Sequence, residues 1–169
     1  MTPDMHAWIL SLLIAVSPPG RVPSRESYDD AIVRYESIAT DLEAVVTDAA
    51  PLYSGPHGHA QTAALLVAIA AHESGLRRDV DEGETRGGGK DACLLQLRNR
   101  PDAATDRRTC FRVGLRLVRA SLAACRTMPE RERLAAYASG SCERGRPESR
   151  AMLDAAKRLY WSHPAPLFP

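Results

Sequence analysis

The sequence predicts a mostly α-helical protein. Apolar residues recur every three or four positions over much of the chain, β-branched runs are scarce, and aromatic residues make up only 5% of the 169 residues. A chain of this length is sufficient for one sizeable hydrophobic core. The formal net charge is +1, from 22 Lys and Arg against 21 Asp and Glu, so no whole-chain field attracts nucleic acid or a membrane surface.

We expect one domain over residues 27–163, preceded by residues 1–26 and followed by a proline-rich tail at residues 164–169. The apolar stretch at residues 6–16 has the length of an export-signal core and is too short to span a bilayer. No Lys or Arg precedes it, and a Pro-Pro pair stands where a cleavage site needs small residues. We therefore favour a first amphipathic helix over an export signal. Its predicted inward face is Trp8, Leu12 and Ala15.

Two long helices are predicted next. Residues 27–49 place apolar side chains at steps of three or four, and Ser27 followed by acidic residues is a typical helix start. The predicted inward face is Tyr28, Ile32, Tyr35, Ile38, Leu42 and Val45. Residues 60–74 are apolar on nearly all sides, which predicts a central, buried helix.

The segment at residues 79–98 differs in composition from its neighbours. It begins polar and rich in glycine and ends in the apolar run CLLQL at residues 93–97. Such a composition predicts a loop followed by a short strand, with no packed helix. The fold expected for the whole chain is therefore mostly α, with a short β and loop segment.

Three more helices are predicted after this segment. Residues 110–126 have an apolar stripe, which predicts one helix. Pro129 and Pro147 stand at the first-turn positions of two further helices, and Gly140 ends the helix that Pro129 starts. Opposite the apolar stripe lies an arginine row that we expect to be a solvated helix face, with a surface for an anionic polymer as the alternative. This row consists of Arg112, Arg116 and Arg119.

The four cysteines, Cys93, Cys110, Cys125 and Cys142, are compatible with two disulfides and an oxidising destination. In one helix, Cys110 and Cys125 would lie about 22 Å apart, because each residue rises ~1.5 Å. A disulfide needs Cα atoms roughly 4.4–6.8 Å apart, so that pairing is excluded. We favour Cys93–Cys110 with Cys125–Cys142 over Cys93–Cys125 with Cys110–Cys142. Four free thiols in a cytoplasmic protein are the alternative, and no CxxC spacing indicates a zinc site.

Three short motifs follow one another along these elements: HESG at 72–75, CLLQ at 93–96 and AYASG at 136–140. In order and spacing they resemble the SLT-type lytic transglycosylases of the lysozyme-like superfamily, which carry Glu-Ser at a helix end, a Gly-Leu-Met-Gln turn and Ala-Tyr-Asn-Ala-Gly. Here the second motif has Cys for Gly and Leu for Met, and Ala138 replaces the Asn of the third. The resemblance covers residues 60–145 and implies a single lysozyme-like domain.

Glu73 is the candidate general acid and base. Breaking a glycosidic bond requires a proton donor for the leaving oxygen, and a carboxylic acid in an apolar setting can supply it. Glu73 ends an apolar helix, so we expect burial to raise its pKa. A solvated carboxylate at a helix end is the competing interpretation.

Four more residues are candidates for substrate binding or support. We expect Ser74 to hold the Glu73 carboxyl or a sugar, and Gln96, on a short strand, to donate to the substrate. The resemblance implies that Tyr137 lies at the catalytic Glu. Ser139 would replace the amide that is missing at Ala138. The structural alternatives are surface exposure for Ser74, backbone contacts for Gln96 and a core position for Tyr137.

A hydrolase with two carboxylates would need a second acid near Glu73. The candidates by position are Asp79, Asp81, Glu82, Glu84 and Asp91. We expect most of them to form a solvated loop face. The resemblance implies that no such partner is used, because the N-acetyl group of muramic acid assists and a 1,6-anhydro product forms.

The sequence therefore predicts a peptidoglycan lytic transglycosylase that cleaves the MurNAc–GlcNAc β-1,4 bond without a metal or other cofactor. We expect it outside the cytoplasm, as a periplasmic or secreted enzyme at the cell wall or as a phage virion protein, with no transmembrane span. The alternatives are a hydrolytic muramidase of the same fold and a non-catalytic peptidoglycan-binding or virion structural protein. Ala138 favours the non-catalytic alternative, whereas Glu73 opposes it because a buried carboxylate without a role is costly.

Overall fold

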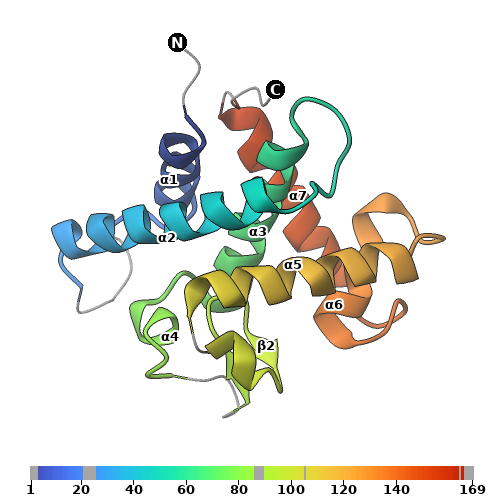
Figure 1. The fold of residues 1–169 in the computed structure, drawn as a ribbon. Helices are drawn as coiled ribbons and strands as arrows, with labels where there is room; N and C mark the ends of the chain where they lie inside the picture. The colour runs from blue at the N-terminus through green and yellow to red at the C-terminus, as the bar shows by residue number, and fades with distance from the viewer. Residues whose placement is uncertain (1–3, 21–25, 86–89, 105, 164, 166–169) are drawn as a thin grey trace.

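The computed structural model describes residues 4–20, 26–85, 90–104, 106–163 and 165. Over these residues the chain forms seven α-helices and one two-stranded antiparallel hairpin in a single domain, as the sequence predicted for the fold class (Figure 1). Residues 1–3 and 21–25 of the segment that precedes the predicted domain, and the predicted tail apart from residue 165, lie outside the described residues.

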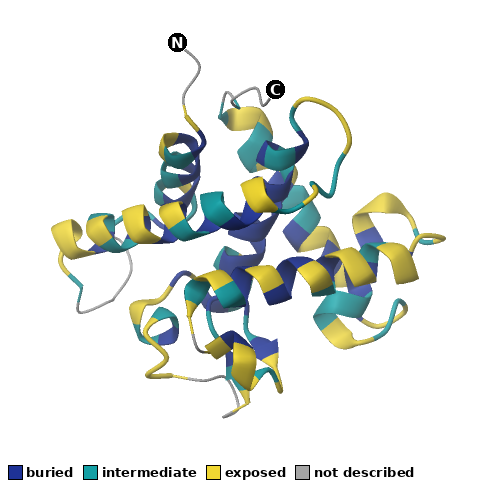
Figure 2. Ribbon diagram, viewed as in Figure 1, coloured by how far each residue is buried: buried dark blue, intermediate teal, exposed yellow. Residues whose placement is uncertain are grey.

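The core is built around α3 (Gly58–Ser74), of which 12 of 17 residues are buried. Four helices pack against it: α1 (Met5–Val16), α2 (Tyr28–Asp48), α5 (Arg107–Ala124) and α7 (Arg146–Ser162). In Figure 2, α3 lies behind α2 and α5 and is largely dark blue, the colour of buried residues. The all-round apolar pattern predicted this central position, because such a helix must be covered on every side.

The helix α1 is part of this core. Trp8 and Leu12 are each no more than 2% exposed, as predicted. Ala15, in contrast, is exposed, because the buried stripe follows the 3.6-residue period and passes beside it. The buried residues of α1 are Met5, Trp8, Ile9, Leu12 and Leu13.

The helix α2 matches its predicted range to within one residue at each end. Ser27 caps it, because its Oγ accepts a hydrogen bond from the backbone N–H of Asp30 at 3.1 Å. The prediction was wrong for Tyr28, which is 61% exposed because it occupies the first position of a helix end that projects past α1 (Figure 1). The buried residues are Ala31, Tyr35, Ile38, Ala39, Leu42, Val45 and Val46.

The segment at residues 79–98 differs from its prediction in two ways. It begins within a short helix, α4 (Arg78–Asp81), where a loop was expected. Furthermore, the run CLLQ forms the turn between β1 (Asp91–Ala92) and β2 (Leu97–Arg98), so Gln96 does not lie on a strand. Cys93 and Gln96 have φ angles of 60° and 48°, in the left-handed region, and this conformation reverses the chain.

A helix was predicted from Pro129 to Gly140, but the structure divides it. A 3₁₀-helix, η3 (Glu130–Glu132), is followed by α6 (Ala135–Ser139), and Gly140 ends α6 as predicted, with a φ of 74°. The division occurs because Ser149 of α7 inserts its Oγ, which accepts from Leu134 N–H and donates to the Arg131 carbonyl, at 2.9 Å each. A second 3₁₀-helix, η2 (Pro101–Ala104), precedes α5.

The two disulfides are the pairs that the sequence favoured. Cys93–Cys110 joins the CLLQ turn to α5, with Cα atoms 6.1 Å apart, and Cys125–Cys142 joins the end of α5 to the loop after α6, with Cα atoms 5.5 Å apart. Disulfides of this kind persist in oxidising compartments. In the described part of the chain, no helix has the length and apolar character needed to cross a membrane.

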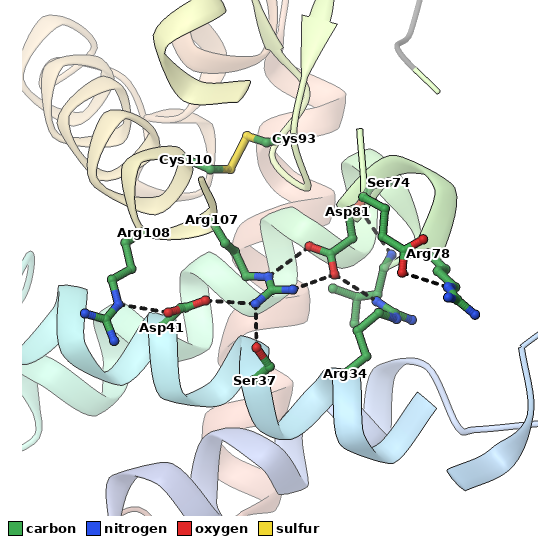
Figure 3. A network of polar contacts seen from close by, with 12 residues as sticks. Arg34, Ser37, Asp41, Ser74, Arg78, Asp81, Cys93, Arg107, Arg108 and Cys110 are labelled. Atoms are coloured by element: carbon green, nitrogen blue, oxygen red, sulfur yellow. Dashed lines mark hydrogen bonds and ion pairs between the residues drawn. A yellow bond between two sulfur atoms is a disulfide. The ribbon is translucent and has the colours of Figure 1, made fainter. Parts of the chain in front are cut away.

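Asp81 lies at the centre of an ion-pair network that joins α4 to α2 and α5 (Figure 3). Its carboxylate accepts hydrogen bonds from Nε and Nη2 of Arg107, at 2.9 Å each, and lies 3.5 Å from Nη1 of Arg34. Arg107 also donates to Asp41, and Arg34 to Glu26, both at 2.8 Å. Only 2% of the Asp81 side chain is exposed, so the expected solvated loop face is wrong for this residue.

Asp81→Asn is expected to lower the free energy of unfolding by about 3 kcal/mol, because removing one side of a buried ion pair leaves the opposite charge uncompensated. Glu82→Gln is the matched control, since it removes a neighbouring but exposed ion pair with Arg78 and should have little effect. Chemical denaturation measures both changes. Equal losses in the two variants would contradict a structural role for the network.

Candidate active site

The central helix ends beside the candidate acid. Glu73 is the penultimate residue of α3, and Gly75 caps the helix with a φ of 60°, a left-handed conformation that glycine adopts without strain. Ser74 Oγ donates to the Ala70 carbonyl at 2.8 Å and accepts from the Leu76 N–H at 3.3 Å. Leu76 is 1% exposed, so the chain turns back into the core at once. The backbone that carries Glu73 is therefore fixed on both sides.

The surroundings of Glu73 disfavour its charged form. Burial is the main cause that raises the pKa of this half-buried carboxyl. His72 opposes the shift, whereas the negative charges of Asp91 and Glu148 reinforce it, so the net direction is upward. Within the described residues, the Glu73 carboxyl takes part in no hydrogen bond or ion pair. A carboxyl group of this kind keeps its proton to a higher pH, as a general acid requires.

Tyr137 links all three sequence motifs. It lies in α6, and its Oη donates a hydrogen bond to the carbonyl oxygen of Leu95, in the CLLQ turn, at 3.1 Å. Burial raises the pKa of Tyr137, and the negative charge of Glu73 raises it further. The phenol therefore stays neutral and can donate. The bond to Leu95 joins AYASG to CLLQ, and the effect of the Glu73 charge on Tyr137 indicates that HESG lies nearby.

Two glycines allow these segments to pack closely. A Cβ atom at Gly114 of α5 would lie 2.1 Å from Cδ1 of Leu95. A Cβ atom at Gly145, just before α7, would lie 2.3 Å from the carbonyl oxygen of Ala135. A residue with a side chain at either position would clash with these atoms unless they moved. The CLLQ turn and α6 are thus held directly against α5 and α7.

The other candidate side chains support chain reversals around Glu73. Gln96 Nε2 donates to the Cys93 carbonyl across the CLLQ turn at 2.9 Å. Ser139 Oγ lies 3.0 Å from the carbonyl oxygens of both Ala135 and Ser141, at the exposed end of α6. Together with Ser74, these residues shape the backbone at the site, and none of the three bonds to the Glu73 carboxyl.

The candidate second acids separate into two groups. Asp79, Asp81 and Glu82 each pair with an arginine, and Glu84 is exposed. Asp91, in β1, also pairs with an arginine, Arg98, at 3.4 Å, but among these acids it alone also raises the pKa of Glu73 through its charge.

Sequence reasoning missed a further acid, Glu148, in the first turn of α7. Only the packing of α7 against α3 and α6 brings this residue near Glu73. A Pro-Glu pair at a helix start gave no local signal of that proximity.

A cavity of about 500 Å³ lies toward the other end of α3. Gln61, Tyr160 and Trp161 are among the residues that line it. Glu73 comes twelve residues after Gln61, which is about 18 Å along a helix, and it does not line the cavity. The cavity is therefore separate from the place where the three motifs meet.

Comparisons of the chain with protein-family models, curated proteins and solved structures find no match. In the residues that the structure describes, no group of three or more His, Cys, Asp or Glu side chains is arranged to hold a metal ion.

Glu73→Gln is expected to increase the free energy of unfolding at neutral pH. The pKa of Glu73 is raised in the folded state, so the folded protein binds this proton more tightly than the unfolded chain does. Wild-type stability should thus fall as the pH rises from the ordinary glutamate range through the folded-state pKa, and the advantage of the variant should vanish at acidic pH.

Denaturant unfolding at a series of pH values measures this effect. Glu143→Gln is the control with the opposite sign, because a hydrogen bond from Ser141 lowers the pKa of Glu143. That variant should be no more stable than wild type at neutral pH. A Glu73→Gln protein that is less stable than wild type at neutral pH would show that the carboxylate is favourably solvated or paired.

Proposed function

We propose that this protein is a peptidoglycan lytic transglycosylase that cleaves the MurNAc–GlcNAc β-1,4 bond with Glu73 as its single acid and base. The observation that carries the proposal is the position of Tyr137, which bonds to Leu95 and whose pKa the negative charge of Glu73 raises. Three motifs that resemble those of SLT-type enzymes thereby meet at one place. A central buried helix that ends at the acid also supports a lysozyme-like arrangement.

In this reaction the Glu73 carboxylic acid donates its proton to the glycosidic oxygen while the bond from that oxygen to C1 of MurNAc breaks. The N-acetyl oxygen of the same sugar assists at C1. The Glu73 carboxylate then accepts the proton of the C6 hydroxyl, whose oxygen forms the new bond to C1. No water is consumed, so the product is a 1,6-anhydro sugar, and Glu73 is again protonated for the next cycle.

The surroundings of Glu73 suit both steps. Burial raises the pKa of the carboxyl, which favours the acid form at the start. The negative charges of Asp91 and Glu148 add to this shift, and they would also stabilise the positive charge that develops on the sugar ring. The neutral phenol of Tyr137 holds the CLLQ turn in place, and Gln96 in that turn is the candidate donor to the substrate.

The runner-up is a hydrolytic muramidase of the same fold. It is favoured by the same two acids, because either Asp91 or Glu148 could serve as the second carboxylate of a hydrolase. A non-catalytic peptidoglycan-binding or virion structural protein is the third candidate, on the ground that Ala138 replaces the Asn of the motif.

The two disulfides support a site of action outside the cytoplasm, at the cell wall or in a phage virion.

Mass spectrometry of the sugars released from purified peptidoglycan tests the reaction. Wild type should release products one water lighter than muropeptides with reducing ends, and Glu73→Gln should release none. Reducing-end products would establish the muramidase instead. If neither protein released sugars while both sedimented with peptidoglycan, the binding or structural role would replace the enzyme.

Tyr137→Phe is expected to slow sugar release about tenfold, equivalent to about 1.4 kcal/mol of transition-state stabilisation, because the CLLQ turn loses its link to α6. Loss of one buried hydrogen bond should also lower the free energy of unfolding by about 1 kcal/mol. Tyr53→Phe is the control, since Tyr53 lines the cavity at the other end of α3 and should not affect the rate. Equal rates of sugar release for both variants and wild type would show that Tyr137 does not contribute to the catalytic site.

A further inference from the structure

The outward face of α5 carries a row of arginines that has no part in the proposed reaction. Arg108, Arg112, Arg116 and Arg119 follow at steps of four, four and three residues, so they share one face of the helix. Arg108 pairs with an aspartate of α2, and Arg119 donates to the backbone carbonyl of Ala50. Arg112 and Arg116 are exposed and make no hydrogen bond or ion pair with any described residue.

This row borders a groove of about 540 Å³ between α5 and the end of α2. Arg112, Arg116 and Arg119 line it together with Asp102 and small apolar side chains, among them Ala49 and Val113. Guanidinium groups thus outnumber carboxylates three to one along the groove. Like charges four residues apart destabilise a helix, so the exposed Arg112 and Arg116 oppose the stability of α5 unless an anion lies against them.

The groove lies on the opposite side of α5 from the Glu73 site. Gly114 faces the CLLQ turn, because a Cβ atom there would meet Leu95. Arg112 and Arg116 are each two residues from Gly114, which at about 100° per residue turns them roughly 160° away from that turn. A ligand in the groove would therefore leave the Glu73 site open.

We propose that this groove binds an anionic polyol-phosphate polymer of the cell envelope. Arg112 and Arg116 lie about 6 Å apart along the helix axis, and Arg119 about 4.5 Å further, which suits a chain with one charge in each short repeat. Each phosphate offers oxygens to two neighbouring guanidinium groups, a geometry that arginine binds well.

Nucleic acid fits the groove less well. The residues that line it include no aromatic side chain on which unpaired bases could stack. The two disulfides also favour a compartment outside the cytoplasm, where the anionic polymers of the cell envelope lie. The inference goes beyond the proposed reaction and does not depend on it.

Isothermal titration calorimetry of the full chain with purified poly(glycerol phosphate) tests the proposal. Wild type should bind at 50 mM salt, and its affinity should fall about tenfold at 200 mM, as for a site that neutralises two or three phosphates. Arg112→Gln/Arg116→Gln should weaken binding about tenfold at 50 mM. Glu73→Gln should bind as wild type does, which separates this groove from the catalytic site.

Arg126→Gln/Arg144→Gln is the matched control, because it removes the same number of exposed charges outside the groove. This control should bind as wild type does, and circular dichroism verifies that both double variants are folded. The proposal is overturned by an absence of wild-type binding at 50 mM, or by equal losses in the two double variants. Tight binding of a single-stranded oligonucleotide through Arg112 and Arg116 would identify a nucleic-acid surface in its place.

Discussion

A helix without a polar face has to be covered on all sides, and this constraint organises the whole protein. The interior of α3 is almost entirely apolar, so α1, α2, α5 and α7 surround it. Glu73 lies where this helix leaves the core, with one side toward protein and one toward solvent. The packing that stabilises the fold thereby also raises the pKa of the acid on which the proposed reaction depends.

The three motif segments are held by contacts of different kinds. Cys93–Cys110 fixes the CLLQ turn to α5 covalently, and the Tyr137 hydroxyl fixes it to α6. Gly114 has no side chain, so α5 packs directly against the CLLQ turn. Glu73 itself gains no hydrogen bond or ion pair within the described residues, so its burial opposes folding. A well-fixed backbone around a carboxyl group that has no bonding partner is typical of functional sites, where activity lowers the stability of the fold.

The features that the sequence predicted well are those that local pattern or chain geometry determines. The all-round apolar composition located α3, Ser27 marked the start of α2, and the length of α5 excluded one cysteine pairing. The features that it missed depend on partners far along the chain. Asp81 looked like a loop carboxylate because its arginines lie in α2 and α5. Likewise, Glu148 reaches the site only through the packing of α7.

We propose that residues 72–75, 93–96 and 136–140 form one glycan-binding site. The most direct test is a series of ¹H–¹⁵N spectra of the Glu73→Gln variant during titration with a GlcNAc–MurNAc oligosaccharide. The largest shift changes should occur together in these three segments. Changes centred on Tyr160 and Trp161, which line the cavity at the other end of α3, or no changes at all, would contradict the claim.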